Sequence, residues 1–236
     1  MKYLRISALG AVVVSLCVIT LGLGGCGKKE AAPEKKTVTT GKKETTKPQK
    51  KEMPVPSTAP ITEERTYYDF ETDDLDGWEI PMWTQGKTDY VATGAAMSED
   101  VASCGNTSMK ITADFPGGLW TSALVEIQQY LDLSHHRVIR ADIYLPEDAP
   151  IGLKAKLILT VGNNWKFVEM SRSVLLIPGE WATITANIEP GSYDWKRIVP
   201  DEEFAEDVRK IAIRIESNRK PKYSGSLYID NVRVGR

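Results

Sequence analysis

From about residue 107 to the C-terminus, short apolar runs alternate with clusters of turn-forming residues. The runs are rich in β-branched and aromatic side chains and have the length of β-strands. Glycine and proline punctuate them, as in Pro116-Gly117-Gly118 and Pro178-Gly179. Many short strands with frequent turns are typical of an all-β sandwich or barrel. The expected strands are 107–112, 124–131, 138–145, 153–161, 166–170, 183–187, 210–215 and 227–234, and residues 201–208 are the only helical candidate.

Alternation along three of these runs predicts which side chains are buried. In residues 138–145, Ile139, Ala141 and Ile143 share one face, and charged or aromatic residues share the other. Residues 154–161 and 210–216 follow the same pattern. Because neighbouring side chains of a strand point to opposite faces, each strand has one face for the core and one outer face. This pattern favours a two-sheet sandwich with polar outer faces.

The last run, Tyr223 to Val234, contains a carboxylate at Asp230 among apolar residues. A buried carboxylate is costly unless a cation or hydrogen-bond donors compensate it. Leu227 and Ile229 have one parity and Val232 the other. Either both faces of this strand are buried, or a β-bulge lies at Asp230-Asn231.

The N-terminus predicts export. Two basic residues precede an apolar run that ends in Leu23-Gly24-Gly25-Cys26, which resembles the lipobox of bacterial lipoproteins. We expect a signal peptide over residues 1–25 and lipidation of Cys26; a single transmembrane anchor is the alternative. Residues 26–65 are rich in Lys, Thr, Glu and Pro, so we expect a disordered linker. One domain, 66–236, remains.

Charge and cysteine content narrow the function of that domain. From Thr66 onward, 18 Lys and Arg residues face 26 Asp and Glu residues, a net charge of −8. This balance argues against nucleic acid as a ligand. Cys104 is the only cysteine of the domain, so no disulfide within the mature domain is expected. Separately, we expect the protein to be a monomer.

An ordered set of segments resembles a known family. They are Tyr68-Asp69-Phe70-Glu71, Gly77-Trp78, Gly105 to Ile111, Leu131 to Ser134, Ala141 to Pro146, Pro178 to Ile184 and Tyr228 to Val232. In this order and spacing, they are similar to the galactose-binding-like β-jelly-roll carbohydrate-binding modules of secreted glucanases, xylanases and mannanases. The resemblance implies an antiparallel two-sheet jelly roll that binds polysaccharide or oligosaccharide.

The same resemblance implies a structural calcium ion. Many modules of the family hold one with residues that correspond to Glu71 and Asp230, aided by the loop before the strand at residue 107, where Glu99 and Asp100 are candidates. Calcium takes six to eight oxygen ligands, including carboxylates and carbonyls. The alternative is that Glu71 and Asp230 accept hydrogen bonds from turn amides or a lysine.

Aromatic side chains are the candidates for contacts with sugar rings, because they offer large contact area at little entropic cost. Trp78 and Trp181 match structural positions of the family and are predicted to be core residues. The predicted ligand-binding residues are Trp83, Trp120, Trp165 and Trp195 in or beside turns, and Arg140, Asp142, Tyr144, Lys156, Arg214 and Glu216 on the outer strand faces. The alternatives are tryptophans folded onto the core and an ordinary solvated sheet face.

We predict no catalytic activity. The two histidines, His135 and His136, are adjacent and have no nucleophile or third metal ligand arranged with them. Asp142 and Glu216 could form an acid pair only if they face one cleft.

The sequence therefore predicts an exported, membrane-anchored lipoprotein, at the cell surface or on the periplasmic face, that binds carbohydrate without changing it. The alternative is an envelope structural or protein-interaction lipoprotein with the same fold and no sugar site. A cleft lined by Trp or Tyr favours the first, and a flat or charge-paired face favours the second.

Overall fold

The computed structural model describes residues 64–219 and 221–236. The predicted signal peptide, Cys26 and nearly all of the linker lie outside these residues. The described elements are β1 (Arg65–Tyr68), the 3-10 turn η1 (Met82–Thr84), β2 (Ala92–Ser98), β3 (Ser108–Phe115), β4 (Trp120–Leu131), β5 (Val138–Tyr144), β6 (Leu153–Val161), β7 (Lys166–Glu169), β8 (Val174–Leu175), β9 (Trp181–Asn187), β10 (Val208–Asn218) and β11 (Tyr223–Gly235).

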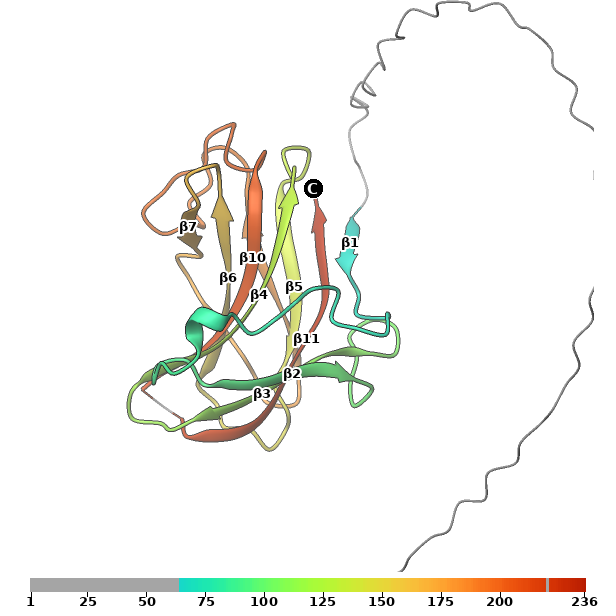
Figure 1. The fold of residues 1–236 in the computed structure, drawn as a ribbon, viewed down its shortest axis with the longest axis vertical. Helices are drawn as coiled ribbons and strands as arrows, with labels where there is room; N and C mark the ends of the chain where they lie inside the picture. The colour runs from blue at the N-terminus through green and yellow to red at the C-terminus, as the bar shows by residue number, and fades with distance from the viewer. Residues whose placement is uncertain (1–63, 220) are drawn as a thin grey trace, which may run out of the picture. The chain divides into compact units, whose positions relative to one another are not determined.

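These strands form two antiparallel sheets (Figure 1). Sheet A has the order β2-β3-β11-β5-β9, with β1 paired to the C-terminal half of β11. Sheet B has the order β4-β10-β6-β7, with β8 paired to β6. Strands distant in sequence are neighbours in both sheets. The structure confirms the predicted all-β, two-sheet antiparallel sandwich of the jelly-roll type.

The predicted alternation places the core correctly. Ile139, Ala141 and Ile143 of β5 are fully buried, and so are Leu157 and Leu159 of β6. They belong to one hydrophobic cluster, which also includes Ile211, Ile213 and Ile215 of β10. The inner faces of both sheets therefore pack against each other, and the outer faces of the two sheets lie on opposite sides of the sandwich.

The closing strand β11 contains a bulge, which was one of the two alternatives left open by its sequence. The register of β11 against β5 shifts between Asp230 and Arg233, and Asn231 adopts a positive φ of 50°. The extra residue changes the parity of the strand, so Ile229 before the bulge and Val232 after it both reach the core.

Three strands were missed by the sequence interpretation, and one helical candidate does not form. β1, β2 and β8 are short or rich in small residues, as in the Ala-Thr-Gly-Ala-Ala run of β2. Of residues 201–208, positions 202–206 form turns, with a hydrogen bond from Phe204 N to Asp201 O (3.2 Å), and Val208 begins β10. Within 64–219 and 221–236, no helix is long and apolar enough to cross a membrane.

Candidate functional site

The outer face of sheet B carries a groove with an apolar floor. Leu124 of β4, Ile158 of β6 and Ala212 of β10 alternate with core residues and point outward, yet each is at most 4% exposed. They form a small hydrophobic cluster that is separate from the core, with Tyr90 packed against it. A cavity of about 250 Å³ lies over this floor. Its lining residues are Trp83, Leu124, Glu126, Ile158, Thr160, Trp165, Phe167, Lys210 and Ala212.

Trp83 reaches the groove because its segment is fixed along β4. Backbone hydrogen bonds join Glu79 to Glu126 in both directions (2.9 Å each), and Val91 N donates to Ser122 O (2.9 Å). The 3-10 turn Met82–Thr84 lies between these two anchors. Trp83 is 44% exposed and makes an edge contact with Tyr90, with ring centroids 5.0 Å apart. The indole is therefore held by its neighbour while much of its surface stays open to a ligand.

Trp165 lines the same groove from the turn between β6 and β7. The turn is closed by a hydrogen bond from Trp165 N to Gly162 O (3.0 Å), and Trp165 has a positive φ of 54°. Its ring lies at an edge to Tyr130, and the Arg209 guanidinium lies 5.1 Å from the ring centroid. A bulky residue in the left-handed region is unfavourable. Trp165 is nevertheless 42% exposed, so the strained turn presents the indole to solvent.

A network of charged side chains extends the outer face of sheet B beside the floor. Glu216 lies 3.6 Å from Lys156 Nζ, and its Oε1 accepts a hydrogen bond from Ser173 (2.6 Å). Arg214 pairs with Glu169 and lies 3.4 Å from Glu216 Oε2. The predicted residues Lys156, Arg214 and Glu216 thus belong together, and the Arg214 guanidinium also lies 5.5 Å from the ring of Trp120. Burial alone would raise the pKa of Glu169, but the neighbouring Lys196, Arg214 and Lys156 lower it below its ordinary value.

The other half of the predicted polar lining lies on the outer face of sheet A. Asp142 is 5% exposed and accepts hydrogen bonds from Thr183 (2.6 Å), Ser103 (2.7 Å) and Arg233 (2.8 Å). Arg140 pairs with Glu64, and Tyr144 packs between the rings of Trp181 and Tyr228. Arg140, Asp142 and Tyr144 therefore do not line the groove. The prediction that they would was wrong, because strand alternation identifies an outward face but not the sheet to which that face belongs.

Burial would raise the pKa of Asp142, but the hydrogen bonds from Thr183, Arg233 and Ser103 lower it. Asp142 and Glu216 lie on opposite outer faces of the sandwich. They cannot form the acid pair of one cleft.

Two tryptophans differ from their expected positions. Trp195 is only 3% exposed, donates its indole N–H to Asn187 O (2.7 Å) and packs against Phe204. It belongs to the core and cannot stack against a sugar. Trp181 is partly exposed on sheet A beside Tyr144 rather than in the core. Trp78 is buried as predicted.

Sequence reasoning missed several groove residues. Tyr90 and Phe167, together with the floor formed by Leu124, Ile158 and Ala212, were not predicted as site residues. Ile158 offered a signal, because it is an aliphatic residue at an outward position of a clearly alternating strand. Phe167 offered another, because it is an aromatic residue only two positions after Trp165, in the short strand that follows the turn. In the structure it is 58% exposed.

The four predicted calcium ligands do not gather around one point. Asp230 is fully buried; its Oδ2 accepts hydrogen bonds from the backbone N–H of Ser103 (2.7 Å) and Cys104 (3.0 Å), and its Oδ1 from Asn231 N (2.6 Å). Burial raises the pKa of Asp230 and these amide bonds oppose the rise. Glu71 Oε1 accepts from the N–H of Asn106 and of Thr107 (2.8 Å each), and these bonds lower its pKa.

Asp100 and Glu99 are placed differently. Asp100 accepts hydrogen bonds from Lys110 (2.7 Å) and Tyr228 (2.9 Å), which lower its pKa to about 2. Glu99 lines an open hollow with Glu71 and Asp73. In the part of the chain that the structure describes, no three His, Cys, Asp or Glu side chains are grouped to hold a metal. Glu71 and Asp230 already accept backbone hydrogen bonds, and calcium binding stays a prediction of the resemblance.

Comparisons with known proteins agree with the two-sheet β-sandwich fold. Residues 68–231 match the model of the family described as mannanase, galactose-binding domain-like. No curated protein sequence matches the chain significantly. Among solved structures, the carbohydrate-binding module CBM27-1 of Caldicellulosiruptor saccharolyticus, determined with mannohexaose, aligns with a TM-score of 0.53 at 17% identity over 74% of this chain and 97% of its own.

A second similar structure is CBM28, a module specific for non-crystalline cellulose. It aligns with a TM-score of 0.52 at 14% identity, over 75% of this chain and 97% of its own. Identities this low establish the fold and leave the ligand open. Since the family model covers most of the sequence, the chain belongs to the mannanase galactose-binding-like domain family.

Proposed function

We propose that this chain is an exported, membrane-anchored lipoprotein that binds a poly- or oligosaccharide in the groove of sheet B without catalysing its conversion. The observation that carries the proposal is the pair of half-exposed indoles, Trp83 and Trp165, which line one cavity over an apolar floor. Sugar rings have apolar faces, and concave sites with aromatic walls and a few polar groups suit such ligands.

Polar groups at the groove can address sugar hydroxyls. Lys210 and Glu126 pair at 2.6 Å and both line the cavity, so they offer a donor and an acceptor in fixed positions. Because the family is named for mannanases and CBM27-1 was solved with mannohexaose, a β-linked mannan is the first ligand to test. Lipidation of Cys26 would anchor the chain, and the linker would hold the domain away from the membrane as a monomer.

The alternative of an envelope protein without a sugar site receives less support. A charge-paired outer face favours it, and Lys156, Arg214, Glu169 and Glu216 form such a patch. This patch occupies only part of the outer face, however, and the groove beside it exposes two indoles.

Calorimetry and affinity electrophoresis against mannohexaose, cellohexaose, xylohexaose and peptidoglycan fragments test the proposal. We expect Trp83→Ala and Trp165→Ala each to weaken binding by about 1–2 kcal/mol, roughly five- to thirtyfold in Kd. Tyr193→Ala is the matched control, since Tyr193 is 83% exposed and does not line the groove. Absence of binding to a broad glycan array by the folded protein would contradict the proposal.

The anchor has its own test. Cys26→Ser should abolish incorporation of a labelled fatty acid and release the protein from the membrane fraction. Retention of the variant in the membrane, without label, would indicate a transmembrane anchor instead.

A further inference from the structure

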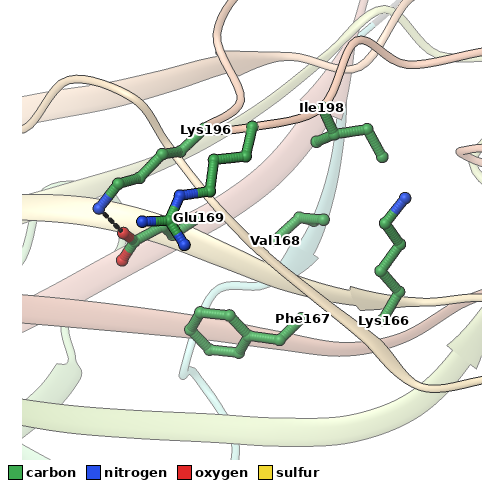
Figure 2. Close-up of a pocket in the computed structure, with 7 residues that line it drawn as sticks. Lys166, Phe167, Val168, Glu169, Lys196 and Ile198 are labelled. Carbon is green, nitrogen blue, oxygen red and sulfur yellow. Dashed lines mark hydrogen bonds and ion pairs between the residues drawn. The ribbon is translucent and has the colours of Figure 1, made fainter.

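A second hollow lies beside the groove, on the outer edge of β7. It has a volume of about 180 Å³ and is lined by Lys166, Phe167, Val168, Glu169, Lys196, Arg197 and Ile198 (Figure 2). Phe167 lines both this hollow and the groove. A polysaccharide bound in the groove could therefore place a substituent in the hollow without leaving the surface.

The hollow forms where the chain separates from β7. Trp195 pairs with Met170, and Lys196 N donates to Glu169 O (2.9 Å). Arg197 then adopts a positive φ of 63°, which turns the chain away from the strand. Left-handed backbone at a residue other than glycine is unfavourable and often marks a functional position. Arg197 and Trp165 thus each have a strained conformation at this part of the surface.

Positive charge dominates the hollow. Of its three cations, Lys196 pairs with Glu169 (2.7 Å), and Glu169 also pairs with Arg214. Figure 2 shows Lys166 at the other end of the hollow, beyond Phe167 and Val168. Within 64–219 and 221–236, neither Lys166 nor Arg197 has a carboxylate partner. The hollow therefore carries positive charge on a domain whose net charge is −8.

The backbone of β7 adds a donor. Met170 N bonds to Leu157 O of β6, whereas Glu169 O accepts from Lys196 on the other side. Because residues of an antiparallel strand turn their backbone groups to alternate sides, Phe167 also turns its N–H toward the hollow. β7 spans only four residues, so an added peptide strand would gain few ladder hydrogen bonds. A small anionic group suits the site better.

We propose that this hollow is an anion subsite of the groove and that the polysaccharide bound by this chain carries carboxylate substituents on its sugars. The inference rests on the proposed function and specifies its ligand class. Lys166 and Arg197 supply the charge, the N–H of Phe167 supplies a hydrogen bond, and the Phe167 ring supports the sugar that bears the carboxylate.

Calorimetry of the full chain tests the subsite with two ligands that differ only in charge. They are β-1,4-glucomannan and the same polymer with part of its primary hydroxyls oxidised to carboxylates. The wild-type protein should bind the oxidised polymer roughly five- to tenfold more tightly at low salt, the effect of one or two charge-assisted contacts. Raising the ionic strength should reduce this preference.

The variant Lys166→Gln/Arg197→Gln should reduce the preference below about twofold while its affinity for the neutral polymer is unchanged. Lys222→Gln/Arg236→Gln removes the same charge from exposed positions immediately before and after β11 and should keep the preference. Equal affinity of the wild-type protein for both polymers would overturn the anion subsite alone. Failure of the folded protein to bind either polymer, and mannohexaose as well, would overturn the proposed function with it.

Discussion

The two outer faces of the sandwich have similar sequence patterns but differ in how many of their side chains are engaged by other residues. Both alternate charged and aromatic residues with core residues along their strands. On sheet A, the segment Asp100–Thr107 supplies hydrogen bonds to Asp142, Asp230 and Glu71, and the aromatic rings pack on one another. On sheet B, Trp83 and Trp165 stay about half exposed over a cavity. The side chains of the sheet A face are fully engaged in hydrogen bonds and packing, so mutations there should reduce stability. The exposed indoles of the sheet B face have surface free for a ligand, so mutations there should reduce binding.

The largest expected effect is on sheet A. Asp230→Ala leaves three partly buried backbone N–H groups without their acceptor, which should lower the free energy of unfolding by about 3–4 kcal/mol. Urea denaturation measures this loss, and the melting temperature should fall by roughly 10 °C. Binding of mannohexaose by the folded variant at low temperature should match the wild type. A loss below 1 kcal/mol would mean that Asp230 is not a structural corner.

A paired substitution separates the two faces directly. Tyr144→Ala removes a ring packed against Trp181 and Tyr228, so it should lower the free energy of unfolding by about 2 kcal/mol and leave sugar affinity unchanged. Trp165→Ala should do the reverse: a stability change of about 0.5 kcal/mol, because the indole is half exposed, with weaker binding. Urea denaturation and calorimetry on both variants check the comparison. Weaker binding by Tyr144→Ala would place a ligand on sheet A.

The sequence was sufficient for the fold class because three of its strands, β5, β6 and β10, alternate apolar and polar residues with a period of two. The parity change in β11 left two alternatives, two buried faces or a bulge at Asp230-Asn231, and the register of β11 and β5 shows the bulge. The site was harder to predict, because parity identifies an outer face but does not identify its sheet. Arg140 and Arg214 look alike in sequence and lie on opposite sides of the sandwich. The pairing between distant strands decides on which sheet a residue lies, and this pairing cannot be read from a single sequence.

Tryptophans show the same limit. Trp165 and Trp195 both sit beside turns in the sequence, yet one is half exposed and the other buried. The difference comes from long-range partners: Asn187 O and Phe204 hold Trp195 in the core, whereas Trp165 contacts Tyr130 at an edge and the Arg209 guanidinium and stays half exposed.

Low pH should lower the free energy of unfolding through Asp100, which contacts the outer face of sheet A. Its pKa is lowered from 3.8 to about 2 by Lys110 and Tyr228. A carboxyl with a lowered folded-state pKa stabilises the fold above its unfolded-state pKa, and this stabilisation is lost as the pH falls through the folded-state value. Asp100→Asn should therefore flatten the loss of stability between about pH 4 and pH 2, measured by urea denaturation across that range. An unchanged slope would show that the Lys110 contact does not persist in solution.

Calcium should have the smallest effect. The resemblance predicts that an ion joins Glu71 and Asp230, but both carboxylates already accept hydrogen bonds from backbone amides of residues 103–107. These N–H donors already offset the cost of burying the Asp230 carboxylate. A calcium ion at Asp230 would therefore add little stability. Melting curves with millimolar CaCl2 and with EDTA should differ by less than about 2 °C. A larger rise with calcium, abolished by Glu71→Gln, would show that the ion displaces these amide contacts and closes sheet A itself.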